Sequence, residues 1–504
     1  MTFVPPESFN IADYFLDARI QEGKAENAAI ITDDGTQTYG ETRDAANRFA
    51  NVLSTAGVRA EERVIIALPD GPEYVAAFFG ILKVGAVVVM VNPDLSPDIV
   101  EYFCKYTGSR TAIVTSDVAP TFHDQQESSR LDQVLVVDGP EFRERFSTAS
   151  IDFGNVVTHR DDPAIWLFSG GTTGRPKAVV QTHRSFANTT ECYAKNVIGY
   201  SEGDRTLSVP KLYFGYATGS NLLFPFSVGA STILFAERCT VGVLMEKIRT
   251  HRPTILINVP TMVNKMVNDD GASRQDLSSL RLSTSAGEAL PAELFHRWQD
   301  AFGVEMLDGL GTAEMWHIFI SNPPGGARPG TIGMAVPGFD VEVRDAEGRV
   351  LPDGQTGWLW VRGDSRAIGY WQQMEKTNRA FLGEWYMSGD LVERDSDGYF
   401  RYRGRSDDLL KVGGKWLAPQ EVEGCLLEHD RVKEVAVVGV VDADGLTKPH
   451  AFVVAVDPDA TLAEALQVYC RERLEAYKHP REVIFVEALP QTHLGKVDRA
   501  KLRA

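Results

Sequence analysis

Short apolar segments of strand type alternate with amphipathic segments of helix type along most of the chain. Residues 64–68, 87–91, 111–114, 134–137 and 254–258 are short runs rich in apolar, often β-branched, residues, whereas residues 40–55 have the spacing of an amphipathic helix. Strands that alternate with helices in this way form largely parallel sheets covered by helices. The pattern therefore predicts an α/β fold up to about residue 340.

The pattern changes twice after that point. Residues 340–345 alternate apolar with charged positions, and Asp-Gly pairs at 353–354 and 397–398 separate short strands, which predicts a small antiparallel β unit. Further on, we expect a helix that begins at Pro419 and another with a capping box of Thr461 and Glu464. The predicted fold is α/β: a large amino-terminal domain, residues 1–405, of mixed sheets flanked by helices plus the antiparallel unit, and a mobile, small α+β domain, residues 406–504.

Charge and cysteine content restrict the class of function. The 504 residues include 51 Lys and Arg against 69 Asp and Glu, a net charge of −18, which gives no overall attraction for nucleic acid or anionic lipid. Five scattered cysteines without a CxxC pair predict neither a disulfide framework nor structural zinc, and they suit a reducing, cytoplasmic compartment. We find no signal-peptide pattern and no predicted membrane span. Small molecules are the expected partners.

The most informative segment is residues 166–177, WLFSGGTTGRPK. An apolar strand pattern leads into a loop of small residues with three hydroxyls, and Lys177 adds a positive charge. Glycine permits positive φ angles, so successive backbone amides can point into one concavity and wrap phosphate oxygens. The loop differs from a P-loop because Ala178 follows the lysine. A flexible surface hairpin is the alternative. The predicted phosphate-binding residues are Ser169, Gly170, Gly171, Thr172, Thr173, Gly174 and Lys177.

This segment resembles the phosphate loop of the adenylate-forming superfamily, which includes acyl- and aryl-CoA ligases, luciferases and the adenylation domains of peptide synthetases. Further segments resemble the family's motifs in the family's order: STSAGEAL at 283–290, DGLGTAEM at 308–315, YMSGDL at 386–391, YRGRSDDLLKVGGKWLAP at 402–419 and LPQTHLGKVDR at 489–499. Together they cover nearly the whole chain. The resemblance implies ATP, Mg²⁺ and coenzyme A as ligands.

The resemblance also assigns nucleotide-binding roles. The acid of the DGLGTAEM segment helps to hold Mg²⁺ in the family, which implies that Glu314 binds the metal and acts in catalysis together with Lys177; a hard cation prefers carboxylate oxygen. Asp390 matches the carboxylate that accepts hydrogen bonds from the ribose hydroxyls, with Arg405 beside it. Read alone, each could be a solvated surface charge or a turn residue. The remaining ATP- or AMP-binding residues implied are Gly287, Glu288, Ala289, Asp308, Gly309 and Thr312.

Three further roles concern the small domain. Lys496 matches the family's catalytic lysine, which contacts the substrate carboxylate and the α-phosphate and would offset negative charge as one anion attacks another. Asp407 matches the hinge about which the small domain of CoA ligases is thought to rotate after the first step. Gly413 and Gly414 would then lie against the pantetheine arm of CoA, where side chains would block a tunnel. Without the family, these glycines indicate only a turn.

The segments at 209–221 and 315–322 resemble the benzoate-CoA ligase branch of the family. That resemblance places Gly215, Tyr216, Gly311, His317 and Ile318 around the acid, with His317 at the rim of the pocket. Aromatic and apolar walls with glycine gaps suit a flat ring. The segment LYFGYATG has no Asp to pair with an α-ammonium group, which disfavours amino acids. Benzoate and 2-aminobenzoate (anthranilate) both stay open, and the resemblance to anthranilate-CoA ligases slightly favours the latter.

The sequence thus predicts an ATP-dependent, AMP-forming aryl-CoA ligase. An aromatic carboxylate would be activated as an aryl adenylate with release of pyrophosphate and then transferred to CoA. Transfer to the phosphopantetheine of a carrier protein is the nearest alternative, and a catalytically inactive nucleotide-binding protein is another. Both a monomer and a homodimer are compatible with the sequence.

Overall fold

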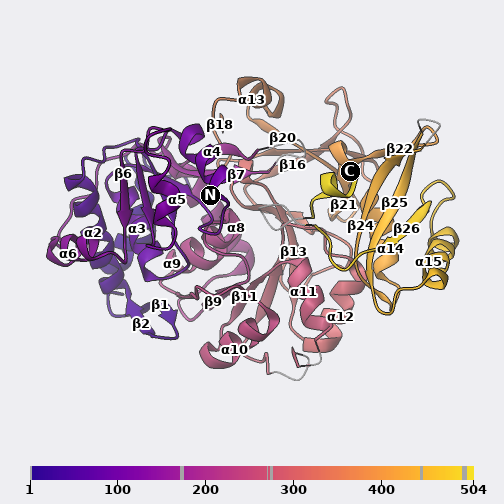
Figure 1. The fold of residues 1–504 in the computed structure, drawn as a ribbon, viewed down its shortest axis with the longest axis horizontal. Helices are drawn as coiled ribbons and strands as arrows, with labels where there is room; N and C mark the ends of the chain where they lie inside the picture. Colours follow the sequence, from indigo (N-terminus) through magenta and orange to yellow (C-terminus); the bar gives the residue numbers. More distant parts are fainter. Residues whose placement is uncertain are drawn as a thin grey trace.

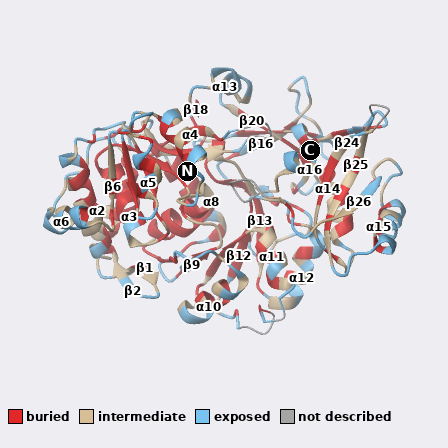
Figure 2. Cartoon of the chain, viewed as in Figure 1, coloured by how far each residue is buried: buried red, intermediate tan, exposed pale blue. Residues whose placement is uncertain are grey.

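Residues 3–170, 175–269, 271–272, 276–442, 446–490 and 497–503 are described by a computed structural model (Figure 1). The fold class is the predicted one, with three sheets in the amino-terminal part and smaller sheets near the carboxyl terminus. Buried residues follow the strands and the inner faces of their covering helices (Figure 2). None of the helices in the described ranges combines the length and the apolar character needed to cross a bilayer.

The first sheet has seven strands in the order β18-β8-β7-β4-β3-β5-β6. β7, β4, β3, β5 and β6 are parallel neighbours, whereas β8 and β18 are antiparallel additions. The strands are β3 (Arg63–Ala67), β4 (Val87–Met90), β5 (Thr111–Val114), β6 (Gln133–Val136), β7 (Pro163–Ser169), β8 (Lys177–Thr182) and β18 (Gly369–Tyr370). The accompanying helices are α2 (Tyr39–Thr55), α3 (Pro72–Lys83), α4 (Pro97–Thr107), α5 (Ala119–His123) and α6 (Pro140–Thr148). The four strands predicted between residues 64 and 137 are confirmed.

The second sheet has nine strands in the order β15-β14-β13-β12-β11-β9-β10-β1-β2. Its strands are β1 (Ala28–Thr32), β2 (Gly35–Thr38), β9 (Arg205–Ser208), β10 (Ser231–Ile233), β11 (Ile255–Asn258), β12 (Leu282–Ser285), β13 (Met306–Gly311), β14 (Ile318–Ser321) and β15 (Met334–Ala335). The run from β1 to β13 in this order is parallel, so its carboxyl ends meet at one edge. Accompanying helices are α7 (His183–Thr189), η2 (Thr190–Ile198), α8 (Gly215–Thr218), η3 (Gly219–Leu223), α9 (Phe224–Phe226), α10 (Val241–His251), α11 (Pro260–Val267) and α12 (Ala292–Phe302).

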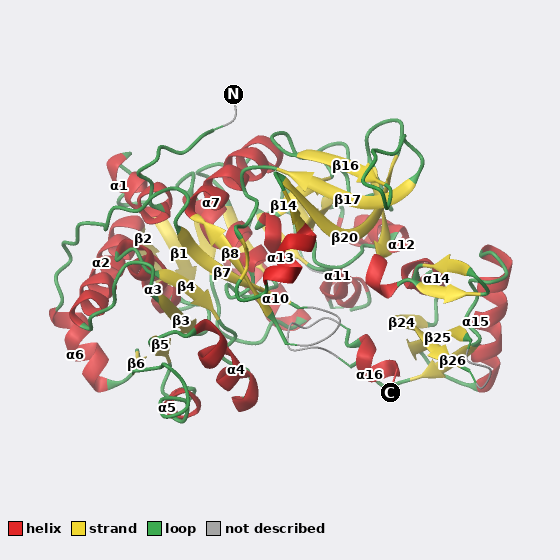
Figure 3. Cartoon of the chain, turned by 90° about the horizontal axis from the view of Figure 1, so that it is seen from above, coloured by secondary structure: helices red, strands yellow, loops and turns green. Residues whose placement is uncertain are grey.

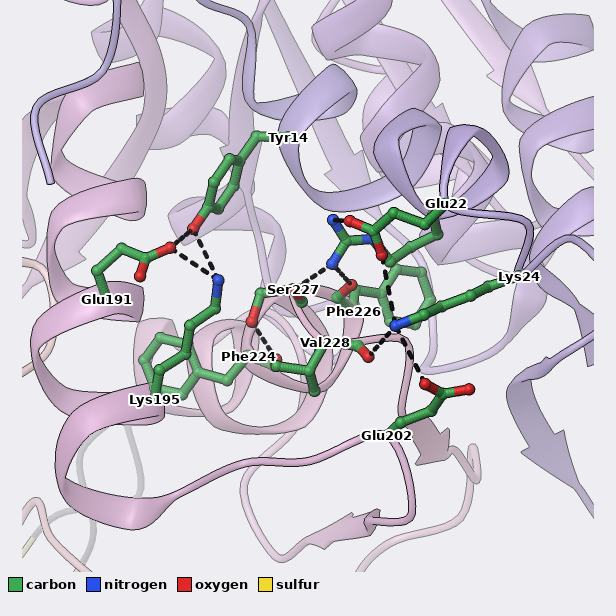
Figure 4. Close-up of polar contacts among 11 residues, drawn as sticks. Tyr14, Glu22, Lys24, Glu191, Lys195, Glu202, Phe224, Phe226, Ser227 and Val228 are labelled. Carbon is green, nitrogen blue, oxygen red and sulfur yellow. Dashed lines mark hydrogen bonds and ion pairs between the residues drawn. The ribbon is translucent and has the colours of Figure 1, made fainter.

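The start of the chain contains η1 (Asp13–Asp17) and α1 (Ala18–Gln21). Polar contacts of this segment and of Lys24 just after it hold it to the part of the fold that contains the second sheet (Figure 4). The Tyr14 hydroxyl donates to Glu191, whose Oε1 also lies 2.7 Å from Nζ of Lys195. Lys24 Nζ donates to the carbonyl of Val228 at 2.9 Å. These groups are outside the candidate site, and we interpret them as fastening one segment to the rest of the fold.

The predicted antiparallel unit is confirmed as a third sheet. It contains β16 (Asp340–Arg344), β17 (Thr356–Arg362), β19 (Phe381–Leu382), β20 (Trp385–Arg394) and β21 (Phe400–Arg405), with α13 (Met374–Ala380) before β19. All of its pairings are antiparallel. β20 and β21 form the hairpin that carries Asp390 and Arg405.

The carboxy-terminal part lies to one side of these sheets (Figure 3). It contains β22 (Leu410–Val412), β23 (Lys415–Leu417), α14 (Pro419–Leu427), β24 (Val432–Val441), β25 (Thr447–Ala455), α15 (Ala460–Arg473), β26 (Glu482–Phe485) and α16 (Arg499–Arg503). One hydrophobic cluster draws all its members from residue 410 onward. The boundary at residues 405 and 406 stays a prediction.

The expected capping box at the start of α15 is wrong. Asp459 is the N-cap, and its carboxylate accepts hydrogen bonds from the amide of Leu462 and the hydroxyl of Thr461. Aspartate is as good an N-cap as threonine. Asp459 precedes Thr461 by two residues and already accepts a hydrogen bond from the first turn of the helix. Thr461 therefore lies inside the helix.

Candidate active site

A cavity of about 160 Å³ opens beyond the carboxyl ends of β12 and β13, the place where open α/β sheets bind ligands. Its walls come from both large sheets. The lining residues are Met90, Val91, Asn92, Leu95, Phe103, Leu167, Phe168, Tyr213, Phe214, Gly215, Tyr216, Ala286, Gly287, Gly311, Thr312, Ala313, Trp316, His317 and Ile318. All five residues predicted to contact the acid are among them, together with Gly287 and Thr312 from the predicted nucleotide set.

Tyr216 and Gly311 set the shape of the cavity wall. The Tyr216 hydroxyl lies 2.7 Å from Oγ1 of Thr284 on β12, which fixes the ring against the second sheet. A Cβ atom at Gly311 would lie 2.5 Å from the carbonyl oxygen of His317. Any side chain there would force the backbone of the next strand away, so packing requires the glycine.

His317 is held in the wall by a tight turn and by its ring nitrogen. Trp316 has φ 62° and ψ −51°, and the His317 amide donates to the carbonyl of Met315 at 2.8 Å, which defines a rare and strained γ-turn. Nε2 of His317 lies 3.1 Å from the carbonyl oxygen of Tyr216, which can only accept, so Nε2 carries the proton. Burial lowers the pKa of His317 to about 3. The ring is neutral at pH 7 and lies within the wall, deeper than the predicted rim.

Lys177, Glu314 and Tyr370 meet at one carboxylate oxygen. Nζ of Lys177 lies 3.3 Å from Oε1 of Glu314, and the Tyr370 hydroxyl donates to the same oxygen at 2.8 Å. The Lys177 ammonium also lies 3.7 Å from the centre of the Tyr370 ring. Burial lowers the pKa of Lys177, and the Glu314 carboxylate opposes that effect. The structure thus joins a predicted phosphate ligand to the predicted metal ligand.

Asp390 and Arg405 are paired residues on β20 and β21. Nη1 of Arg405 lies 3.3 Å from Oδ1 of Asp390, and the Tyr402 hydroxyl donates to that oxygen at 3.4 Å. Asp390 is buried and Arg405 is half-exposed. A carboxylate oriented in this way can accept hydrogen bonds from a pair of hydroxyl groups.

The segment predicted to face adenine follows β12. Gly287 has φ 90°, and a Cβ atom added to it would have no heavy atom within 4 Å, so flat ligands can approach its backbone. Ala289 is exposed. The Glu288 carboxylate accepts hydrogen bonds from the amide and hydroxyl of Thr261, at 3.2 and 2.7 Å, at the start of α11. The Glu288 side chain therefore stabilises the turn after β12 by binding it to the start of α11.

Two predicted nucleotide residues are deeply buried on β13. Asp308 is 3 % exposed, and burial raises the pKa of its carboxyl well above the usual value. A Cβ atom at Gly309 would lie 2.8 Å from the carbonyl oxygen of Ile320 on β14. Gly309 allows the two strands to pack closely, and the nucleotide contacts of Asp308 and Gly309 stay a prediction.

Five predicted residues, Gly171, Thr172, Thr173, Gly174 and Lys496, lie outside the described residues. The ends of the first segment are described: Ser169 pairs with Lys177 across β7 and β8, and Gly170 is exposed. The Tyr102 hydroxyl donates to the carbonyl of Pro176 at 2.6 Å. The amide of Ala178 donates to the Tyr106 hydroxyl at 3.3 Å. Helix α4 therefore holds the start of β8 in place.

Asp407 lies in a single 3₁₀ turn, Ser406–Asp408, between β21 and β22, and its side chain is exposed. Gly413 and Gly414, with φ 56° and 80°, form the two-residue loop of the hairpin β22–β23, and both are exposed. Two positive φ angles are what a tight hairpin turn of this length requires.

The described residues on both sides of Lys496 are firmly anchored. The amide of Asp498 donates to the carbonyl of Pro490 at 2.7 Å. Arg499 donates to the carbonyl of Val437 at 2.7 Å and, through both terminal nitrogens, to the carboxylate of Glu423. Burial lowers the pKa of Arg499, but the Glu423 carboxylate, with smaller effects of Asp408 and Tyr402, raises it above the usual value.

Among the described residues, no group of three or more His, Cys, Asp or Glu side chains could hold a metal ion alone. Glu314 nevertheless fits Mg²⁺, because a buried carboxylate beside a phosphate-binding lysine supplies the kind of oxygen that a hard cation takes together with phosphate oxygens and water.

Comparison with known proteins identifies the family. Residues 17–371 match the family described as AMP-binding enzyme, and residues 421–496 match the AMP-binding enzyme C-terminal domain. The chain belongs to the AMP-binding enzyme family. A benzoate–CoA ligase of Thauera aromatica is 38% identical over 99% of this chain and 96% of the relative. An anthranilate–CoA ligase of Pseudomonas aeruginosa is 32% identical over 88% of this chain and 86% of the relative.

Solved structures give the same grouping for this AMP-binding enzyme. An anthranilate CoA ligase in complex with anthranoyl-AMP has a TM-score of 0.95 and 38% identity, covering 99% of this chain and 97% of that one. A benzoate CoA ligase from Burkholderia xenovorans LB400 has a TM-score of 0.91 and 40% identity, covering 98% and 100%.

Two features of the AMP-binding enzyme's site have no recognisable signal in the sequence. Tyr370 lies on the edge strand β18, far in sequence from the lysine and the glutamate that it contacts, and a Gly-Tyr pair carries no signal for such a role. The wall contributed by the first sheet and its helices, including Met90 on β4 and Phe103 on α4, was missed as well. Met90 and Phe103 are apolar, like ordinary core residues. Only the packing of the two sheets with their helices places them at a cavity.

Proposed function

We propose that this AMP-binding enzyme, an ATP-dependent aryl-CoA ligase, activates benzoate or a benzoate with one small substituent such as the 2-amino group of anthranilate. The observation that carries the proposal is the cavity of about 160 Å³ between the two large sheets. An apolar cavity of about 150 Å³ is enough for a benzene-sized ring. The space therefore suits one ring and leaves little room for a second ring or a long chain.

The lining of the cavity supports an uncharged ring. Among the lining residues that the structure describes, none is Asp, Glu, Lys or Arg. An α-ammonium group would be buried without a counter-ion, which is strongly unfavourable. An aromatic amine is nearly neutral at pH 7 and avoids that penalty. Relatives that are named for benzoate and for anthranilate support the same class of acid.

In the first half-reaction, a carboxylate oxygen of the acid attacks the α-phosphorus of ATP. The bond from that phosphorus to the bridging oxygen of the β-phosphate breaks, and pyrophosphate leaves with an aryl adenylate remaining. In the second, the sulfur of CoA attacks the acyl carbon, AMP leaves, and the thiol proton passes to solvent. Binding and orientation by this chain's own side chains account for most of such a mechanism.

The proposed roles follow the geometry. The cavity holds the ring with its carboxylate toward Thr312, Asp390 and Arg405 hold the ribose, and Lys177 holds the phosphates. Glu314 would hold Mg²⁺, which when bound neutralises charge on the phosphate oxygens. Lys496 would contact the acid carboxylate and the α-phosphate.

We also propose that residues 1–405 and 406–504 act as two domains that turn about Asp407 between the half-reactions. The 3₁₀ turn at Ser406–Asp408 supports this, because it is a short link between two sheets and Asp407 in it is exposed. After such a turn, Gly413 and Gly414 would approach the site and leave room for the pantetheine arm.

A substrate panel tests the proposed acid. With Mg-ATP and CoA, we expect kcat/KM for benzoate, 2-aminobenzoate or a hydroxybenzoate to exceed that for cinnamate, 2-naphthoate and phenylalanine at least tenfold. Exchange of labelled pyrophosphate into ATP reports the first half-reaction separately. Equal activity on 2-naphthoate and benzoate would contradict the single-ring cavity, and absence of exchange with every aryl acid would contradict the proposed function.

A further inference from the structure

The two charged groups proposed to receive nucleotide and metal are paired with each other. The ammonium of Lys177 and the hydroxyl of Tyr370 both contact Oε1 of Glu314, at 3.3 and 2.8 Å. Glu314 and Tyr370 are buried, and Lys177 is half-buried. Each charge is therefore largely compensated by the other, as a buried carboxylate requires.

Backbone contacts hold the three residues in fixed relation. β18 pairs with β8, and Tyr370 lies opposite Val179. Val179 follows Lys177 by two residues on β8, so Tyr370 and Lys177 lie near each other on neighbouring strands. The amide of Ala367 donates to the carbonyl of Glu314 at 2.8 Å. Gln181 on β8 donates from Nε2 to the carbonyl of Ala313 at 2.7 Å. The phenol and the carboxylate can thus stay in place when the flexible lysine side chain moves.

We propose that the Lys177–Glu314 pair makes the binding of nucleotide and of Mg²⁺ mutually dependent, and that Tyr370 is the positioning residue that holds Glu314 when Lys177 leaves it. The proposal rests on the proposed function, because it takes Lys177 as a phosphate ligand and Glu314 as the metal ligand. It goes further by assigning an energetic coupling between the two ligands and a role to Tyr370.

The coupling follows from charge. A divalent cation that approaches Glu314 alone must displace an ammonium group from the carboxylate. A triphosphate that approaches Lys177 alone meets the negative charge of Glu314. When both arrive, the phosphate takes the ammonium and the metal takes the carboxylate, so no charge loses its partner. Each ligand then raises the affinity of the other by the same factor, as linkage requires.

Tyr370 has two separable contributions. Its hydroxyl is a neutral donor that can remain on Glu314 after the ammonium departs, and it fixes one oxygen of the carboxylate. Its ring face, 3.7 Å from the ammonium, favours the cation while no nucleotide is bound. Tyr370→Phe removes the first and keeps the second, so it isolates the positioning of Glu314.

The first test measures the binding of AMP-PNP, an ATP analogue with an uncleavable β–γ bond, by calorimetry with Mg²⁺ and with EDTA. We expect Tyr370→Phe to keep the metal-free Kd within twofold of the wild type and to weaken binding in Mg²⁺ at least threefold. Glu314→Gln should bind metal-free AMP-PNP at least threefold more tightly than the wild type. Tyr39→Phe is the matched control, because its buried hydroxyl donates to the carbonyl of Ala230 far from the site.

The second test uses Mn²⁺, followed by its electron paramagnetic resonance signal, with no nucleotide present. Lys177→Gln should bind Mn²⁺ at least threefold more tightly than the wild type, because the carboxylate is no longer occupied. Unchanged Mn²⁺ affinity in Lys177→Gln, or an unchanged ratio of AMP-PNP affinities in Tyr370→Phe, would overturn the coupling. Pyrophosphate exchange by the wild type distinguishes a failure of the proposed function from a failure of the coupling. If exchange occurs while the coupling tests fail, only the coupling is wrong.

Discussion

Oδ1 of Asp390 lies 3.3 Å from Nη1 of Arg405, and the two residues are direct partners in the ladder between β20 and β21. Their contact is therefore fixed by strand register rather than by flexible loops. The Tyr402 hydroxyl reaches the same oxygen from two pairs further along the hairpin. These two contacts and the strand pairing hold the Asp390 carboxylate in place.

Asp390→Asn should weaken the binding of AMP and ATP by tenfold or more without unfolding the protein. Hydrogen bonds to a charged group contribute about 1.5–3 kcal/mol, and the amide keeps the shape of the side chain while losing the charge. Calorimetry with AMP measures the change. Glu393→Gln is a matched control on the same strand, since Glu393 pairs with Arg403 at 2.7 Å. Equal losses in both variants would show that the hairpin, and not the carboxylate, matters for binding.

Lys496→Ala should abolish formation of the aryl adenylate while leaving thioester formation from a supplied adenylate within severalfold of the wild type. The lysine is proposed to offset charge only while one anion attacks another. Pyrophosphate exchange reports the first step, and CoA thioester formation from synthetic benzoyl-AMP reports the second. Lys501→Ala, an exposed lysine on the nearby helix α16, is the control. A similar loss in both assays would contradict the division of roles.

Asp407→Pro should have the reverse effect. Proline fixes φ near −65°, so the 3₁₀ turn between β21 and β22 loses freedom to change direction. We expect pyrophosphate exchange to persist and thioester formation from the adenylate to fall at least tenfold. Asp407→Ala is the control, because it removes the side chain but keeps the freedom of the backbone to rotate. If the proline variant makes thioester at the wild-type rate, no rotation is needed at this residue.

Two buried histidines should make the protein less stable in mild acid. Burial lowers the pKa of His183 and of His317 to about 3, whereas an unfolded histidine titrates near 6.5. The unfolded state therefore binds more protons than the folded state as pH falls from about 6.5 toward 3, and stability is lost in that window. At pH 5.5 each histidine contributes a loss of about 1.4 kcal/mol relative to neutral pH.

His183→Gln tests that expected loss. Chemical denaturation at pH 7.5 and 5.5 should show that the wild type loses about 1.4 kcal/mol more than the variant. His183 is suited to the test because Nδ1 accepts the amide of Ile11 at 3.2 Å, a bond that a glutamine oxygen can also accept. An identical pH dependence in the two proteins would mean that His183 binds a proton in the folded state.

Asp70 should act in the opposite direction. Burial raises its pKa to about 6, against the attraction of Lys211 and the hydrogen bond from the amide of Leu212. The folded state then holds the proton more tightly, so this residue's stabilising effect is present at low pH and is lost as pH rises through about 6. Between pH 5 and 8 the wild type should lose about 1.4 kcal/mol that Asp70→Asn does not lose. If the unfolding free energies of the wild type and of Asp70→Asn change equally between pH 5 and 8, the prediction is wrong.

Local sequence was sufficient wherever one short segment decides its own structure. Apolar runs predicted the strands β3 to β6 and β11, and Pro419 begins α14 as expected. The start of α15 was placed wrongly because Asp459 and Thr461 are both good caps, and the choice between them depends on where the preceding strand ends. The candidate residues for acid, ribose and metal were named by their motifs.

The relative positions of these residues could not be predicted in the same way. Tyr370 contacts Glu314 across 56 positions of sequence. Met90 on β4 and Phe103 on α4 reach the acid cavity from the first sheet and one of its helices. His317 looked like a group for the pocket's rim, but the turn at Trp316 places it within the wall. Contacts of this kind depend on how separate sheets pack, and composition gives the same apolar signal for core and for cavity.

The order of strands and helices, the family motifs and the chemical type of each candidate group could be read from the chain alone, because these depend on neighbours along it. The size of the acid cavity, the protonation state of His317 and the sharing of one Glu314 oxygen by Lys177 and Tyr370 follow instead from the folded arrangement. Those properties arise from burial and from distances between segments that are remote in sequence, and neither quantity exists until the sheets have packed.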